Sequence, residues 1–239
     1  MSKQQRKVLA TLLSIIALGV VGFLGVTSDR STIPAQPEPP IDTSQVESAS
    51  TELAATVLTE LDMKGRAPKT GYAREQFGAG WAEVDACDMR QFILARDLES
   101  EVLDDDGCTV LSGVLNDPYT GKIIQFQRGS GTSAKVQIDH VVALSDAWQK
   151  GAQNLDVSER TEFANDPLNL LAVDGPTNQK KSDSDAASWL PPNKEYRCRY
   201  VARQIAVKKK YKLWVTPAEF DTMKQVLSTC PDQRLPVVE

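Results

Sequence analysis

A run of 21 residues without a charged side chain, Val8 to Ser28, follows a basic N-terminal stretch and limits where a globular fold can begin. The apolar region of a cleavable export signal has about 7–15 residues, whereas a helix that spans a membrane needs about 20. A cleaved export signal and a permanent membrane anchor both stay open, and we favour the export signal. Residues 1–28 are therefore predicted to be a signal peptide or an N-terminal membrane anchor. The protein is expected to be secreted or anchored at the outer face of the cytoplasmic membrane.

Composition changes after this segment. Residues 29–50 are rich in Pro, Ser, Gln and acidic residues, which predicts a disordered tether. Residues 51–239 are long enough for one domain with a core of ordinary size. Helical and strand-like periodicities both occur there, which predicts an α+β fold. Helices are expected at about 51–61, 88–103, 143–152, 194–208 and 217–227 and from Pro176 or Thr177, and strands at about 108–111, 122–127, 135–140 and 169–173.

The chain has four cysteines, and this even number fits an exported protein because disulfides persist outside the reducing cytosol. None of them forms a C-x-x-C pair, which argues against a zinc knuckle. Three pairings are possible for four cysteines. We favour the pairing between neighbours in the sequence, Cys87–Cys108 and Cys198–Cys230. Each bond would then close a loop of ordinary length and contribute about 3 kcal/mol to stability.

The two halves of the chain differ in charge. Residues 29–134 carry 9 Lys and Arg against 18 Asp and Glu, whereas residues 135–239 carry 15 against 14. A polyanion is therefore expected to bind the C-terminal half. Arg199, Arg203 and Lys210 fall near one face of a basic helix there, and we predict that they contact the phosphate backbone of a nucleic acid. The alternative is that this helix only keeps the protein soluble.

The polar residues that could carry chemistry lie at 135–190, around His140, the only histidine of the chain. Cleavage of a phosphodiester bond needs a base that deprotonates water and a cation that stabilises charge on the phosphate. Histidine has the ordinary pKa nearest to neutral pH, so His140 is the candidate base. Asp139, directly before it, and the downstream Asn178 can offer oxygen ligands to a metal ion.

Two protein oxygens, with the other positions left to water and phosphate, favour Mg²⁺ as the one divalent metal, with Mn²⁺ as the alternative. Lys181 lies three residues after Asn178 and so shares its helical face. Its ammonium could hold a phosphate of the substrate. The alternative for Lys181 is a solvated surface residue.

The segment around these residues resembles a known family. Asp139-His140, Asn169 and Asn178, in strand–strand–helix order, resemble the motif of the HNH or ββα-metal endonucleases. The surrounding sequence is similar to exported HNH-family proteins of Gram-positive bacteria and to the nuclease domain of certain modification-dependent restriction enzymes. The resemblance runs from about residue 58 to residue 230. The stretches that carry it are IDHVVALSDAWQKGA, RTEFANDPLNLLAVDGPTNQKKSD, WLPP, CDMRQFILARDL and NDPYTG.

The resemblance implies a role for each residue of the motif. His140 would be the general base that activates water, and Asp139 and Asn178 would bind the metal. Asn169 would hold the loop that bears His140, a role for which Asn165 is a rival. The first and last motif positions are Asp and Asn where the best-known members of the family have His. This departure shifts the ligands toward oxygen and favours magnesium over zinc.

These patterns predict an α+β domain with a ββα-metal core at about 135–190, embedded among helices. The expected activity is metal-dependent hydrolysis of nucleic acid, with DNA favoured and little sequence preference, because no base-reading module is visible. The main alternative is a catalytically inert envelope protein that keeps the fold and binds nucleic acid or a partner. A peptide or glycan hydrolase fares worse, since a zinc peptidase needs several histidine ligands. We expect a monomer that contacts a membrane only through its N-terminal segment.

Overall fold

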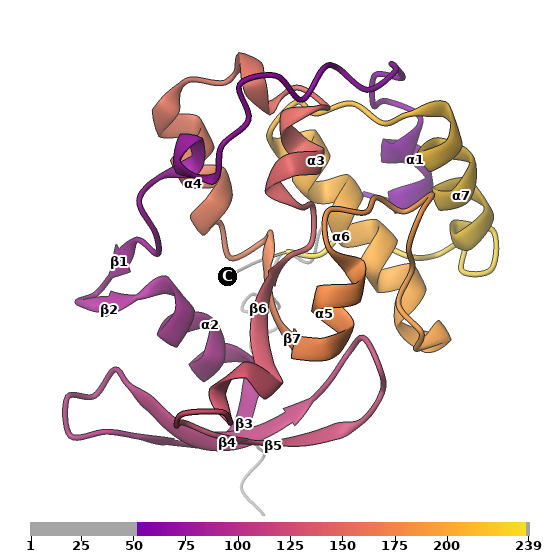
Figure 1. Cartoon of the computed structure of the whole chain (residues 1–239). Helices are drawn as coiled ribbons and strands as arrows, with labels where there is room; N and C mark the ends of the chain where they lie inside the picture. Colours follow the sequence, from indigo (N-terminus) through magenta and orange to yellow (C-terminus); the bar gives the residue numbers. More distant parts are fainter. Residues whose placement is uncertain (1–51, 238–239) are drawn as a thin grey trace, which may run out of the picture. The chain divides into compact units, whose positions relative to one another are not determined.

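The computed structural model describes residues 52–237 (Figure 1). The predicted export segment, residues 1–28, and the predicted tether, residues 29–50, lie outside the described residues. Within the described range the chain forms helices and small sheets, which confirms the α+β class. None of the helices between residues 52 and 237 is long and apolar enough to cross a membrane.

The elements are short and alternate along the chain. The helices are α1 (Ala54–Leu58), α2 (Met89–Asp97), α3 (Leu144–Trp148), α4 (Val157–Asn165), α5 (Gly175–Lys181), α6 (Arg197–Lys210) and α7 (Pro217–Leu227). The strands are β1 (Glu83–Val84), β2 (Cys87–Asp88), β3 (Leu98–Leu103), β4 (Val110–Asn116), β5 (Ile123–Gln127), β6 (Val136–His140) and β7 (Leu170–Asp174). Short 3-10 helices lie at Arg74–Phe77, Ser133–Lys135, Ala152–Asn154 and Lys194–Tyr196. Helix α4 and the β1–β2 pair lie where no element was expected.

Helix α2 is shorter than the helix expected at 88–103, so that expectation was wrong in its second half. The side chain of Asp88 caps its start, and the helix ends at Asp97. Leu98–Leu103 forms strand β3, which pairs with β4 in the antiparallel sheet β3–β4–β5. The Asp97 carboxylate accepts a hydrogen bond from the backbone N–H of Ala172 on β7. These contacts between distant segments override the local helical pattern.

Strands β6 and β7 form an antiparallel pair of their own, and helix α5 follows β7 directly (Figure 1). The register pairs His140, at the end of β6, with the first residue of β7. The Asp174 side chain caps α5, and Pro176 occupies its first turn. Gly175 is required at this junction, because a Cβ would lie 2.0 Å from the backbone oxygen of Ala134. The expected strand–strand–helix order is thus observed.

Strand β7 lies at the centre of the packing. Leu170 and Ala172 belong to the hydrophobic cluster formed with α2 and the β3–β4–β5 sheet. Leu171 and Val173 belong to the cluster formed with α6 and α7. A strand that is buried on both faces reads as a continuous apolar run, as this one does. The end of the β6–β7 pair is therefore held firmly from two sides.

Both disulfides that were favoured from the sequence are formed. Cys87–Cys108 joins β2 to the segment between β3 and β4, and Cys198–Cys230 joins α6 to the segment after α7. The two bonds span 21 and 32 residues of sequence. No cysteine in the described part of the chain is free.

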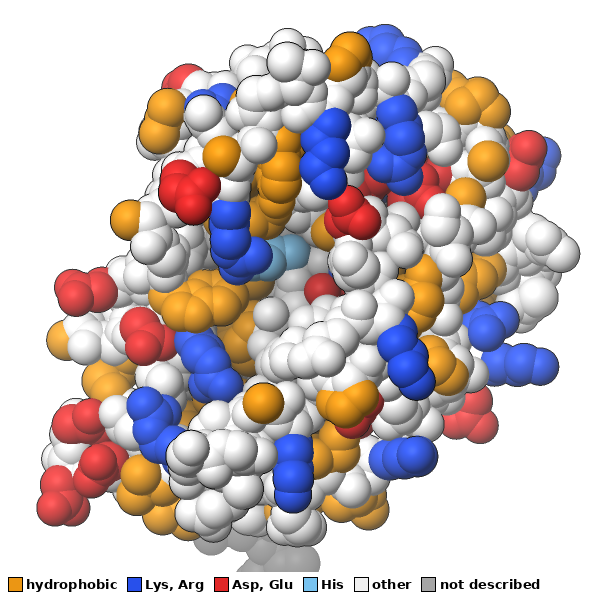
Figure 2. Space-filling model, in the orientation of Figure 1, with side chains coloured by type: hydrophobic (Ala, Val, Ile, Leu, Met, Phe, Trp, Pro, Cys, Tyr) orange, Lys and Arg blue, Asp and Glu red, His pale blue; other side chains and the backbone are white. Residues whose placement is uncertain are grey.

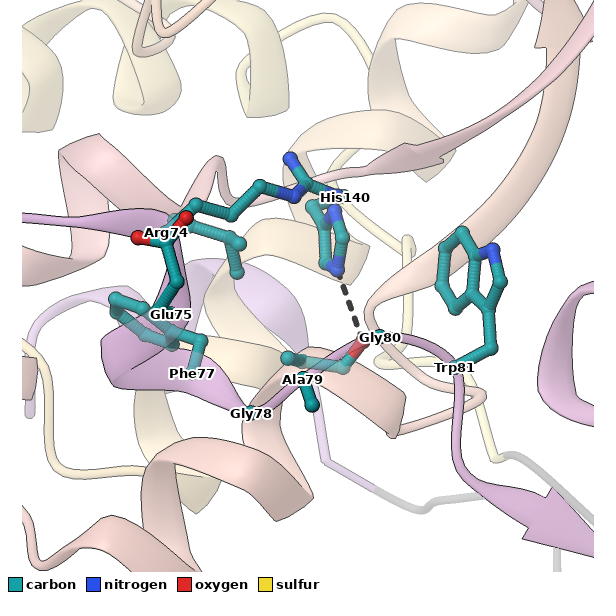
Figure 3. Close-up of a pocket in the computed structure, with 10 residues that line it drawn as sticks. Arg74, Glu75, Phe77, Gly78, Ala79, Gly80, Trp81 and His140 are labelled. Atoms are coloured by element: carbon teal, nitrogen blue, oxygen red, sulfur yellow. Dashed lines mark hydrogen bonds between the residues drawn. The ribbon is translucent and has the colours of Figure 1, made fainter.

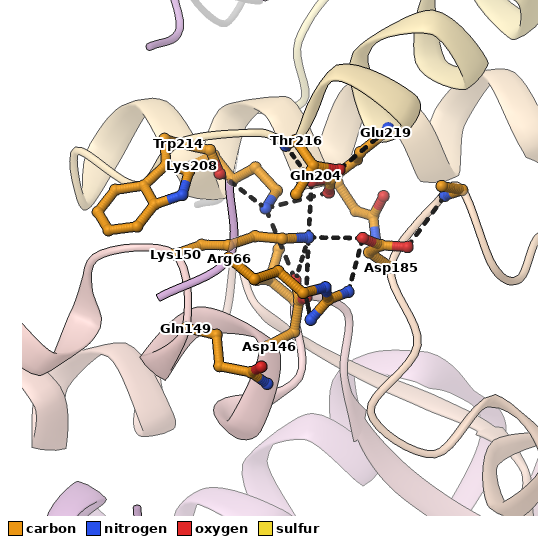
Figure 4. Close-up of polar contacts among 12 residues, drawn as sticks. Arg66, Asp146, Gln149, Lys150, Asp185, Gln204, Lys208, Trp214, Thr216 and Glu219 are labelled. Carbon is orange, nitrogen blue, oxygen red and sulfur yellow. Dashed lines mark hydrogen bonds and ion pairs between the residues drawn. The ribbon is translucent and has the colours of Figure 1, made fainter. Parts of the chain in front are cut away.

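A network of buried charges connects the helical part of the fold (Figure 4). Lys150 is fully buried, and its Nζ lies 2.7–2.8 Å from three carboxylates. Lys208 is also fully buried and lies 3.1 Å from one of these carboxylates. Three cations face three carboxylates, so the buried charges are paired, as burial requires. The members are Arg66, Asp146, Lys150, Asp185, Lys208 and Glu219.

Candidate active site

The imidazole of His140 is buried at the end of β6, with 8% of the residue exposed. Its Nε2 lies 2.8 Å from the backbone oxygen of Ala164, at the end of α4 (Figure 3). A carbonyl oxygen can only accept, so Nε2 must carry the hydrogen. In the neutral ring Nδ1 is then the nitrogen with a free lone pair. The fold therefore selects the tautomer in which Nδ1 can act as a base.

Burial lowers the pKa of His140 from 6.5 to about 4. Burial is the largest cause of this lowered pKa, the bond to Ala164 opposes it, and the nearby cations of Arg74 and Lys181 contribute to it. The imidazole is consequently neutral at pH 7 and able to accept a proton.

Asn169 holds the loop that follows His140. The residue is fully buried, and its Oδ1 accepts a hydrogen bond of 2.9 Å from the backbone N–H of Val142. Its Nδ2 donates to the backbone oxygens of Val142 and Phe163. The rival Asn165 instead binds the backbone N–H of Ala82, at 2.7 Å, and does not reach this loop. Asn169 thus links the loop after His140 to helix α4, and its role in the reaction stays a prediction.

The Asp139 carboxylate is held by two buried side chains. Its Oδ1 lies 3.0 Å from Lys181 Nζ, and its Oδ2 accepts a hydrogen bond from the Tyr119 hydroxyl. Burial raises the pKa of Asp139, and the contacts with Lys181 and Tyr119 oppose this shift. Lys181 is fully buried and also donates to the backbone oxygen of His140. Its ammonium therefore faces Asp139 inside the protein. The predicted contact with a substrate phosphate would need the ammonium to face solvent.

A cleft of about 340 Å³ brings Asp139, His140 and Asn178 together. The Asn178 Nδ2 donates to the side chain of Gln137 at 3.0 Å. Its Oδ1 receives no hydrogen bond from residues 52–237 and is available to a ligand. Asp183, also on the cleft wall, accepts hydrogen bonds from Lys69 and Ser145.

These residues fit a hard divalent cation with few protein ligands. Each carboxylate oxygen has two lone pairs, and the bonds to Asp139 use one on each oxygen. Asp139 and Asn178 can therefore each offer one oxygen to the cleft. No group of three or more His, Cys, Asp or Glu residues suited to a metal occurs among the described residues. Magnesium tolerates such a site, because it keeps several waters and binds substrate phosphates.

Two basic residues on the cleft wall were not expected from the sequence. Lys69 and Arg74 come from the segment before β1, in the acidic half of the chain. Figure 3 shows Arg74 reaching the end of the imidazole opposite the hydrogen-bonded nitrogen. Figure 2 shows Lys and Arg side chains around the hollow in which the pale blue His140 is visible. The sequence signal that could have found them is a local excess of basic residues, Lys64, Arg66, Lys69 and Arg74, within the otherwise acidic half of the chain.

A second cavity of about 300 Å³ lies on another side of His140. It shares Arg74, His140 and Leu144 with the cleft. Phe77 and Trp81 line it as well, and the indole plane of Trp81 lies within 10° of the imidazole plane. This aromatic wall was not predicted from the sequence.

The predicted basic face of α6 lies apart from the cleft. Arg203 donates three hydrogen bonds to the backbone oxygens of residues 167, 168 and 170, at the start of β7 and just before it. Lys210 pairs with Asp166 at 2.8 Å, and Arg199 lies over the ring of Tyr196. None of the three lines either cavity beside His140. Their contact with nucleic acid stays a prediction.

Comparison with known proteins first indicates the class, a nuclease-related domain. Residues 88–226, more than half of the chain, match the family described as GmrSD restriction endonucleases, C-terminal domain. The chain belongs to this family. A relative from Arthroderma benhamiae, called an uncharacterized secreted protein, is 38% identical over 212 residues, which are 87% of this chain and 98% of the relative. The expected relation to a restriction-enzyme domain is thereby confirmed; the HNH type and the relation to Gram-positive proteins stay predictions.

Proposed function

We propose that this protein is an exported, metal-dependent endonuclease of the HNH type that hydrolyses nucleic acid, with DNA as the favoured substrate. The observation that carries the proposal is the environment of His140, a neutral buried imidazole beside a cleft. The bond from its Nε2 to Ala164 leaves Nδ1 free to accept a proton. The family supports the nuclease class, and the relative described as secreted supports export.

In the proposed reaction Nδ1 of His140 takes a proton from the water that attacks phosphorus, the bond from phosphorus to the leaving oxygen breaks, and the leaving oxygen takes up a proton from solvent. Asp139 and Asn178 would hold the divalent metal, which supplies positive charge to the phosphate oxygens. Lys69 and Arg74 would bind the phosphate from the cleft wall. A bound phosphate also places negative charge beside His140, which raises its pKa and makes it a stronger base.

Cleavage of plasmid DNA by the full-length protein, with magnesium or with a chelator, tests the proposal. The wild-type protein should cleave only with the metal, and His140→Ala should lower the rate by about 10²- to 10⁴-fold. Thermal unfolding of the variant shows whether its fold is kept. Wild-type turnover by His140→Ala would refute the role of the base. Failure of the wild-type protein to cleave DNA or RNA would favour the inert binding alternative.

A further inference from the structure

The second cavity is built as a binding site and not as packing space. Figure 3 shows Phe77 and Trp81 on opposite sides of it, with Gly78, Ala79 and Gly80 running between them. A Cβ placed on Gly80 would meet no atom within 4 Å, so the space beside this residue is open. The volume of about 300 Å³ is at the lower end for ligand pockets and suits a small flat group.

The wall of the cavity offers stacking and hydrogen bonds together. The indole of Trp81 is half-buried, lines the cavity and lies nearly parallel to the imidazole of His140, whereas Phe77 is buried against Trp148 and Phe163 and closes the far side. The backbone N–H groups of Ala79, Gly80 and Trp81 make no hydrogen bond with any described residue. A planar aromatic ring such as that of Trp81, next to free backbone donors, is the arrangement that binds an unpaired nucleobase through its face and its edge.

The position of Trp81 is fixed by its neighbours in the chain. The next residue, Ala82, donates from its N–H to Asn165 and accepts from the N–H of Met89. The β1–β2 pair follows at once and is tied down by the Cys87–Cys108 disulfide. A platform that is already ordered loses little entropy when a ligand binds.

Arg74 and His140 belong to both cavities, so a phosphate bound at the cleft lies next to the aromatic wall. We propose that the second cavity binds the nucleobase adjacent to the cleaved phosphodiester bond, and that the substrate is therefore single-stranded or locally unpaired nucleic acid. This inference rests on the proposed function. In a duplex the same base is paired and stacked, and it would have to be extruded at a cost that a single strand does not carry.

Binding of short DNA to the full-length protein, in a chelator so that no bond is cleaved, tests the inference. Three probes are compared: a single strand, the duplex of the same sequence, and the single strand with abasic sugars. The single strand should bind best. Trp81→Ala should weaken its binding by about 5- to 150-fold, the range for loss of one stacked base. Trp81→Phe should restore most of the affinity. Binding is measured because Trp81 also lies beside His140, and a change in rate alone would be ambiguous.

Trp214→Ala is the matched control, since Trp214 is also half-buried and lines neither cavity. It should bind all probes as the wild-type protein does. The abasic strand should bind weakly and be insensitive to Trp81→Ala. Equal losses for the single strand and the abasic strand on Trp81→Ala would overturn the inference, as would no loss. Binding that depends on Trp81 without cleavage in magnesium would refute the proposed function but keep the pocket. Cleavage that is equally fast with Trp81→Ala and equally fast on single and double strands would refute the base pocket but keep the proposed function.

Discussion

Replacement of His140 by asparagine should make the stability of the protein less sensitive to pH between pH 7 and pH 5. Burial lowers the pKa of His140 from its ordinary 6.5 to about 4 in the folded protein. In the unfolded chain the imidazole is exposed and titrates near its ordinary value. Between the two values the unfolded state binds a proton that the folded state does not. The free energy of unfolding therefore falls as the pH falls.

The size of this effect follows from the two pKa values. Linkage predicts a loss of about 2 kcal/mol between pH 7 and pH 5, rising to about 3 kcal/mol once the pH is below 4. Such a loss is large beside a typical stability of about 5–15 kcal/mol. His140 is the only histidine, so no other imidazole adds to the effect. The carboxylates are common to both proteins and cancel in the comparison.

Urea denaturation of the wild-type and His140→Asn proteins at several pH values, without reductant, measures the difference. The variant can be more or less stable at pH 7, because only the change with pH is compared. The wild-type protein should lose about 2 kcal/mol more than the variant by pH 5. Parallel losses in the two proteins would show that His140 keeps its ordinary pKa, and the argument for a neutral buried base would fail.

Three other predictions concern separate parts of the molecule. Lys150→Met should lower the free energy of unfolding by about 3–5 kcal/mol, because buried carboxylates lose their cation. Lys64→Met, which removes an exposed ion pair, should change it far less. Asp139→Asn should raise the magnesium concentration for half-maximal cleavage, and unchanged metal affinity in calorimetry would contradict its assignment as a ligand. Arg199→Glu should reduce the slope of log affinity for DNA against log salt by about 0.7–0.9. An unchanged slope would mean that this face of α6 does not contact DNA.

The centre of the candidate site could be predicted because its pattern is local. The alternation at 135–140, the apolar run at 169–173 and the Pro176 that follows predict two strands and a helix in that order. Asp139 and His140 lie at the end of the first strand, and Asn178 lies on the helix that follows the second strand. Asp139 and His140 therefore come to the same cleft as Asn178, as expected.

The remaining parts depend on contacts between distant segments, which local patterns do not report. Arg74 and Trp81 reach His140 from a segment that reads only as a loop. Lys181 has the spacing of an exposed helical residue, but the packing of α5 on β6 turns it toward Asp139. Helix α2 ends early for the same kind of reason, since sheet pairing and a bond to β7 compete with the helical pattern.

The walls beside His140 come from three separated stretches, residues 69–81, 138–145 and 178–183, together with Ala164. The strand–strand–helix unit is consequently not a portable module. If this unit were transferred into another protein, it would carry Asp139 and His140. The cationic and aromatic walls would be missing, because they belong to residues 69–81. Two proteins that share only the short motif can thus differ in what they bind, because the walls of this site extend over residues 69–183.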